Sequence, residues 1–196
     1  MNRMEKLGHQ VSELMEQLDR DITGFRAWSG LGCAFGCGRC CLKPDIEAAP
    51  LEFLPFALAV HREGALDQWL DRLECAPGIC VIFDEDQAGA GKCSRYPHRG
   101  LICRLFGFAA RRNKYGRKEL VTCAIIKTDQ ATAFSEAENA IADDERSVPV
   151  FTDYYDRLRD LDDSLGGRYV PVNQAIRMAL ETVSAYFRYE AGEAPV

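Results

Sequence analysis

The chain has 196 residues, of which 47% are hydrophobic and 28% charged, and its formal net charge is −6. A chain of this length buries roughly 70% of its unfolded surface, so it does not need disulfides to hold a core. The acidic balance argues against nucleic acid and anionic membranes as partners, because both are bound through clustered positive charge. The most hydrophobic stretch, residues 51–60, is far shorter than the roughly 18 residues that span a bilayer.

The first predicted element is a helix over residues 1–30, because apolar residues from Leu7 to Phe25 recur there at steps of three and four. Two further helices are predicted over residues 46–62 and 65–73, separated at Gly64.

Strand signals follow in the middle of the chain. Residues 79–83 form a short β-branched and aromatic run, which predicts a strand. Residues 105–111 and 119–126 predict a β-hairpin across the turn at 113–116.

Helical patterns return over residues 129–142, 150–161 and 173–189, with Asn173 as the expected N-cap of the last helix. The prediction is therefore an α+β fold, with helices enclosing a small, irregular, cysteine-rich centre and a short β-hairpin.

We expect one domain over residues 1–196. Within it, residues 31–125 form the cysteine-cluster core, residues 1–30 the N-terminal helix and residues 126–196 the C-terminal helices.

The nine cysteines are an odd number, so they cannot all pair within the chain. Residues 1–6 lead straight into an amphipathic pattern and not into a cleavable apolar leader, which predicts a cytoplasmic protein. In a reducing cytosol, clustered cysteines are metal ligands or redox centres more often than disulfides.

The strongest signal is the run Cys33-Ala-Phe-Gly-Cys37-Gly-Arg-Cys40-Cys41. Its glycines let the backbone turn tightly enough to aim several sulfurs at one point. Thiolates select zinc, copper(I) or iron–sulfur clusters over hard cations.

Four dispersed cysteines, Cys80, Cys93, Cys103 and Cys123, bring the predicted metal ligands to eight. Eight thiolates suit two four-sulfur sites, or one cluster and one zinc site, and the pairing of cysteines stays open. The remaining thiol, Cys75, lies at a predicted helix end and is expected to be dispensable.

The chain resembles the YkgJ-type cysteine-cluster family, described as zinc- or iron-chelating. The resemblance covers roughly residues 31–125 and includes all eight predicted ligands; its other matching residues are Phe83, Ser94, Arg95, Tyr96, Arg99, Arg104, Leu105 and Phe106. The family usually has proline after the residue equivalent to Arg99, whereas this chain has Gly100. The resemblance implies metal binding, and some larger relatives look like flagellin lysine methylases that depend on an iron–sulfur cluster.

The spacing of Cys33, Cys37 and Cys40 also matches the radical S-adenosylmethionine enzymes. Those enzymes look like α/β barrels, whereas this sequence shows no regular alternation of strands and helices. We therefore set that interpretation aside.

Arginines lie close to several predicted ligands, and we assign Arg104, next to Cys103, a cofactor-binding role, with ordinary ion pairing as the alternative. Its guanidinium would offset the negative charge of a thiolate centre. His98 lies in a predicted turn and is expected to be solvated.

Residues 111–118 carry five positive charges in eight positions, at the tip of the predicted hairpin. A solvated tip that protects a sheet edge explains such a cluster, and docking of an acidic protein partner or anionic substrate is the alternative.

The leading hypothesis is a cytoplasmic metal-binding protein whose eight cysteines hold an iron–sulfur cluster, zinc or both, with a redox, metal-handling or enzyme-support role. The tight cysteine run favours iron–sulfur over zinc. Two alternatives remain: an iron–sulfur enzyme of the oxidoreductase or protein methyl-transfer type, and a structural zinc module for protein interaction. No catalytic residue is assigned.

Overall fold

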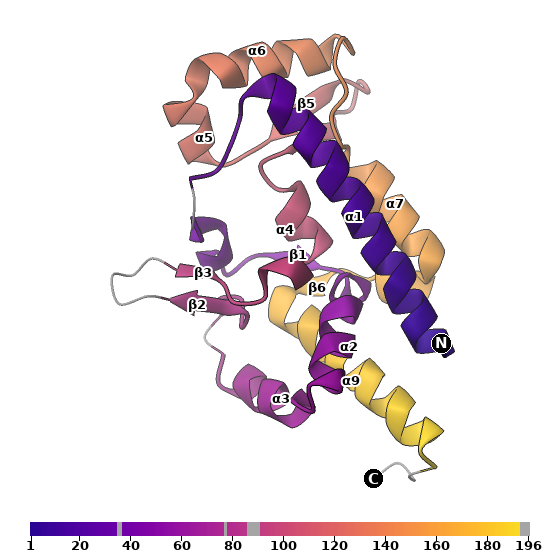
Figure 1. Ribbon diagram of the computed structural model, residues 1–196. Coiled ribbons are helices and arrows are strands. Elements are labelled where there is room, and N and C mark those ends of the chain that lie inside the picture. The colour runs from indigo at the N-terminus through magenta and orange to yellow at the C-terminus, as the bar shows by residue number, and fades with distance from the viewer. Residues whose placement is uncertain (35–36, 77, 86–90, 193–196) are drawn as a thin grey trace. The chain divides into compact units, whose positions relative to one another are not determined.

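The computed structural model describes residues 1–34, 37–76, 78–85 and 91–192 (Figure 1). The chain divides into two compact units, which we describe separately. The first comprises Met1–Ser12, Gly36–Gly100 and Leu158–Val196, and the second comprises Glu13–Phe35 and Leu101–Arg157. Helices α1 (Arg3–Ser29) and α7 (Phe151–Leu161) each contribute residues to both units.

The first unit is built around three helices. Helix α9 (Val172–Glu190) packs against α2 (Leu54–Arg62) and α3 (Leu66–Glu74), as Figure 1 shows. The predicted apolar stripe of α9 is buried, including Ile176 and Leu180 at 0% exposure, so burial of this face explains why the segment is helical.

The other elements of the first unit are short. They are the 3₁₀ helices η1 (Arg39–Leu42), η2 (Pro50–Phe53) and η3 (Tyr96–His98), helix α8 (Asp163–Gly166), and the antiparallel strand pairs β1 (Glu47–Ala48) with β6 (Val170–Pro171) and β2 (Phe83–Glu85) with β3 (Gly91–Cys93).

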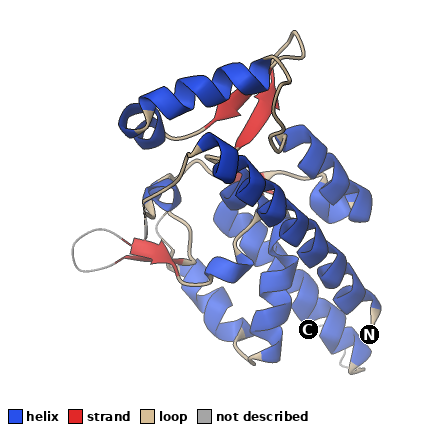
Figure 2. Cartoon of the chain, turned by 45° about the horizontal axis from the view of Figure 1, so that its top comes forward, coloured by secondary structure: helices blue, strands red, loops and turns tan. Residues whose placement is uncertain are grey.

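The second unit consists of a β-hairpin and the helices beside it. Strands β4 (Ala109–Arg112) and β5 (Lys118–Val121) pair antiparallel, with Ala109 opposite Val121. Helix α6 (Ala131–Ala142) lies along β5, as Figure 2 shows. Helices α4 (Leu101–Leu105) and α5 (Ala124–Asp129) flank the hairpin in the sequence. The buried core of this unit includes Phe25, Leu120 and Ile141.

The α+β class is confirmed, because helices combine with small antiparallel strand pairs. Three long helical predictions are confirmed as α1, α7 and α9. The prediction of a single domain stays a prediction. Among the described residues, no helix combines the length and the apolar character needed to cross a membrane.

Several predicted boundaries are wrong for local reasons. The helix expected from residue 46 begins later, because Pro50 follows Ala49, which is extended at φ −88° and ψ 139°. Residue 79 lies in a bend, residue 80 in irregular backbone and residues 81–82 in a turn, and only Phe83 of that run lies in a strand. The helix expected over residues 129–142 breaks at Gln130, between α5 and α6.

The β4–β5 hairpin is present but shorter than expected, because residue 105 ends helix α4, residues 106–108 form a turn and residues 124–126 start helix α5. Asn173 is not the N-cap of α9, since that position belongs to Pro171.

Candidate metal centre

All nine cysteines lie in described residues and none is in a disulfide. The first unit contains five of the eight predicted ligands: Cys37, Cys40, Cys41, Cys80 and Cys93. The second unit contains the other three: Cys33, Cys103 and Cys123.

In the first unit, η1 presents the adjacent Cys40 and Cys41. The turn is closed by a hydrogen bond from the Cys41 backbone N–H to the Gly38 carbonyl oxygen, at 2.9 Å. A Cβ atom at Gly38 would lie 2.3 Å from the Gly91 carbonyl oxygen and 2.5 Å from Phe83 Cε2. Glycine is therefore required here by the close approach of η1 to the β2–β3 hairpin. Gly36, the other glycine of the run, lies outside the described residues.

The β2–β3 hairpin carries Cys93 and adjoins Cys80. Cys93 pairs with Phe83 across the two strands, and the Phe83 N–H donates to the Cys80 carbonyl oxygen at 3.0 Å. Ser94 donates from both its N–H and its Oγ to the Ile82 carbonyl oxygen, at 2.9 and 2.8 Å. These bonds hold the turn at residues 80–83 beside the strand that carries Cys93.

The thiols of this hairpin and of η1 shift one another's pKa values. A hydrogen bond from the Cys41 thiol lowers the pKa of Cys40 to about 6, and the positive charge of Arg99 contributes. Burial raises the pKa of Cys80 to about 11, with smaller contributions from Cys93 and Cys40.

Burial also raises the pKa of Cys93, and the charges of Asp84 and Cys40 add to this effect. Cys40, Cys80 and Cys93 thus lie within electrostatic reach of one another, and Cys41 bonds to Cys40; we call these four residues the four-thiol cluster.

Its donor set fits a soft transition metal, because all four donors are sulfur. No set of three ligand-type side chains within the described ranges has the arrangement of a formed metal site. Cys37 is exposed near the start of η1, and Cys75 is exposed at the C-cap of α3.

In the second unit, Cys123 is the N-cap of α5. Its Sγ accepts a hydrogen bond from the Ile126 N–H at 3.5 Å, and its side chain packs against the buried core. Cys103 lies in α4 and is half-buried, whereas Cys33 is exposed just beyond the end of α1.

The predicted arginines have distinct surroundings. Arg104 is 6% exposed, and its Nη1 forms an ion pair with Asp19 of α1. Arg95 is paired with Glu63 at 2.6 Å, whereas the charge of Arg99 favours the thiolates of Cys40 and Cys93. The cofactor role of Arg104 stays a prediction. The arginine whose charge acts on the four-thiol cluster is Arg99.

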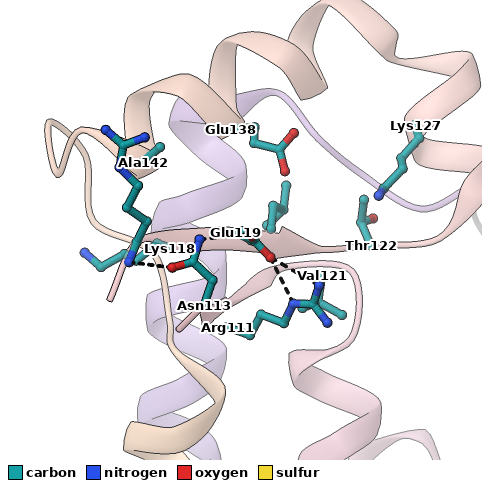
Figure 3. Close-up of a pocket in the computed structure, with 11 residues that line it drawn as sticks. Arg111, Asn113, Lys118, Glu119, Val121, Thr122, Lys127, Glu138 and Ala142 are labelled. Atoms are coloured by element: carbon teal, nitrogen blue, oxygen red, sulfur yellow. Dashed lines mark hydrogen bonds and ion pairs between the residues drawn. The ribbon is translucent and has the colours of Figure 1, made fainter. Parts of the chain in front are cut away.

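A pocket of about 520 Å³ lies on the β4–β5 hairpin of the second unit, and we call it the hairpin pocket (Figure 3). Its charged lining residues are Arg111, Arg117, Lys118, Glu119, Lys127 and Glu138.

Arg111 pairs with Glu119 at 3.1 Å, and Lys118 pairs with Asp144. Within the part of the chain that the structure describes, Arg117 and Lys127 have no carboxylate partner. Figure 3 shows Lys127 and Glu138 extending from α5 and α6 toward β5. The basic hairpin tip predicted from the sequence therefore adjoins a concave surface with two uncompensated cations.

Residues 32–124 match a family model named CxxCxxCC, described as "Putative zinc- or iron-chelating domain". The matched segment contains all eight predicted ligands and coincides closely with the predicted core at residues 31–125. No curated protein and no solved structure matches the chain. Over residues 32–124 the chain is therefore similar to the CxxCxxCC domain family, in agreement with the cysteine spacing.

Proposed function

We propose that the chain holds zinc or an iron–sulfur cluster through cysteine thiolates in a reducing cytoplasm. Cys40, Cys41, Cys80 and Cys93 are the proposed ligands of one centre. The observation that carries the proposal is the four-thiol cluster, in which one thiol has its pKa lowered to about 6. Such a thiol is largely deprotonated at neutral pH, which is the form that binds metals.

The identity of the metal decides the kind of function. Four thiolates on zinc make a closed, structural site, and the function then lies in a surface that contacts a partner. An iron–sulfur cluster supplies electron transfer, and its potential depends on nearby charge such as that of Arg99. The run Cys33, Cys37, Cys40 favours the cluster, whereas the complete set of four sulfurs suits zinc. The ligand roles of Cys33, Cys37, Cys103 and Cys123 stay predictions.

The test compares two serine variants of the first unit, purified anaerobically. Cys93→Ser removes a proposed ligand, and Cys75→Ser makes the same chemical change at an exposed helix end. We expect Cys93→Ser to lose most of its bound metal and to unfold at a lower temperature, because metal binding and folding are coupled. Cys75→Ser should keep the wild-type content of metal. Equal metal content in the two variants would refute the ligand role of Cys93.

A second candidate function is supported by the hairpin pocket. We propose that residues 111–118 and this pocket dock an acidic segment of a partner protein. Arg117 and Lys127 supply uncompensated positive charge in a protein whose net charge is −6, and Tyr115 is 77% exposed at the tip. Opposite charges at such a surface steer association and orient the partner.

A hexaglutamate peptide serves as the probe for this surface. The double variant Arg117→Ser, Lys127→Ser should bind the peptide at least about fivefold more weakly at low salt, because two charge contacts are lost. Lys92→Ser is the control, since Lys92 is an exposed lysine on β3 of the first unit. Binding that is unaffected by the double variant, or reduced as much by the control, would contradict the proposal.

A further inference from the structure

Cys80 lies in a turn whose backbone is held from both sides by one side chain. Asn173 Oδ1 accepts a hydrogen bond from the Val81 N–H at 2.8 Å, and its Nδ2 donates to the Ile79 carbonyl oxygen at 2.7 Å. Asn173 stands in the first turn of α9, so a long, well-packed helix anchors the two residues that flank Cys80. The start of α9 is itself fixed, because the Val172 N–H donates to the Ile46 carbonyl oxygen at 2.8 Å.

In the second unit a carboxamide also bonds the backbone beside a cysteine, in this case both polar groups of the one residue before it. Gln130 Oε1 accepts from the Gly32 N–H at 3.0 Å, and its Nε2 donates to the Gly32 carbonyl oxygen at 2.7 Å. Gly32 directly precedes Cys33. The backbone of Gln130 is itself fixed by two hydrogen bonds: its N–H donates to the Ile126 carbonyl oxygen, and its carbonyl oxygen accepts from the Phe134 N–H.

A carboxamide suits this task because it offers one acceptor and a donor in one plane, as a peptide group does. The backbone next to Cys80 and Cys33 has no strand or helix of its own, so its polar groups need partners from elsewhere. Both carboxamides come from beyond residue 124, outside the segment that matches the family. The C-terminal part of the chain therefore supplies groups that hold cysteine turns within the family segment.

We infer that Asn173 and Gln130 are positioning residues for metal binding: they hold the backbone beside Cys80 and Cys33 so that these thiols are presented in a fixed geometry. The inference rests on the proposed function. Outer contacts that orient metal ligands contribute about 10- to 100-fold to metal affinity. Helices α6 and α9 thus belong to the metal-binding machinery.

The first test titrates the metal-free proteins with Co²⁺, whose charge-transfer absorption reports thiolate ligands. Asn173→Ala and Gln130→Ala should each bind Co²⁺ about 10- to 100-fold more weakly, with a changed charge-transfer spectrum. Gln130→Glu keeps the acceptor for the Gly32 N–H but loses the donor, so its affinity should lie between those of wild type and Gln130→Ala.

Two controls remove carboxamides from α9 and from α6, the helix that Gln130 caps, without touching a cysteine turn. Gln174 is the exposed neighbour of Asn173 in α9, and Asn139 is exposed on α6. Gln174→Ala and Asn139→Ala should keep wild-type affinity and spectrum. Wild-type affinity and spectrum in Asn173→Ala and Gln130→Ala would overturn the inference while leaving metal binding intact.

Hydrogen exchange of the metal-free proteins tests the two carboxamide contacts without any metal. The Val81 amide should exchange faster in Asn173→Ala, and the Gly32 amide faster in Gln130→Ala, with the controls unchanged. Unchanged exchange at both amides would refute the contacts themselves. A wild-type protein that shows no thiolate–cobalt band would instead defeat the proposed function, and with it the positioning role.

Discussion

Cys40 and Cys80 belong to one cluster but have opposite pKa shifts. The Cys41 thiol donates a hydrogen bond that stabilises the Cys40 thiolate, whereas burial destabilises the Cys80 thiolate. A metal that bound both would replace a proton at Cys80 but meet a thiolate at Cys40. We therefore expect Cys40 to be the first thiol of the cluster available to a metal in neutral solution.

This difference predicts distinct alkylation of the metal-free protein. The pKa of Cys40 is about 6, so the rate of its reaction with iodoacetamide should be nearly constant between pH 7 and 9. The pKa of Cys80 is about 11, so its rate should rise about tenfold with each pH unit over the same range. Mass spectrometry of peptides from timed reactions measures both rates. The same pH dependence at the two thiols would contradict the assignment.

The eight ligand assignments stay predictions, but part of the local arrangement of the cysteines could be predicted from the sequence. Cysteine type and spacing indicate Cys40 and Cys41 as neighbours in one turn, because adjacent residues share local backbone. The approach of Cys80 and Cys93 depends on pairing between β2 and β3, which short strands signal weakly. The sequence predicts Asn173 as an N-cap, because a polar residue before an apolar stripe is typical of caps. Its observed partners, at Ile79 and Val81, lie too far away in the sequence for a local pattern to indicate them.

At the scale of elements, the contact between η1 and the β2–β3 hairpin is the decisive one. This contact brings the turn with Cys40 and Cys41 against the strand that ends at Cys93. It depends on the absence of a side chain at Gly38 and at Gly91. A Cβ atom at Gly91 would lie 2.3 Å from the Asp84 carbonyl oxygen, so the hairpin tolerates no side chain there either.

Gly38→Ala should therefore separate η1 from the hairpin. We expect a loss of about 1–3 kcal/mol in the free energy of unfolding, because the added methyl group clashes with backbone at Gly91. The amount of bound metal should fall in parallel.

Gly24→Ala in α1 is the control, since nothing lies within 4 Å of its added Cβ, and it should stabilise the protein by up to about 1 kcal/mol. Urea unfolding measures both, and a Gly38→Ala variant as stable as wild type would disprove the close approach.

Long elements were predictable because their apolar periodicity extends over several turns, as in α1, α7 and α9. Short elements could not be predicted in this way, because two or three residues are too few to show a hydrophobic periodicity. Strand β1, for example, lies where the sequence predicts the start of a helix, because the apolar residues around it fit helical spacing, whereas Pro50 makes the preceding residue extended. The pairing of β1 with β6 joins segments more than a hundred residues apart, which no local pattern indicates.

For the whole molecule, the family segment is only part of what surrounds the cysteines. Residues 32–124 contribute to both compact units, with the four-thiol cluster in the first and Cys33, Cys103 and Cys123 in the second. Residues beyond 124 complete each unit through α6 and α9. Because the carboxamide contacts come from these flanks, the segment that defines the family depends on neighbouring helices for its backbone geometry.

The measurement that tests the account most directly is the metal and acid-labile sulfide content of the anaerobically purified full chain. We expect at least about one zinc per chain, or iron together with labile sulfide, and protection of the cysteines from thiol reagents in the folded protein. A folded protein that contains neither metal nor sulfide, binds neither when supplied, and exposes all nine thiols to reagent would contradict it.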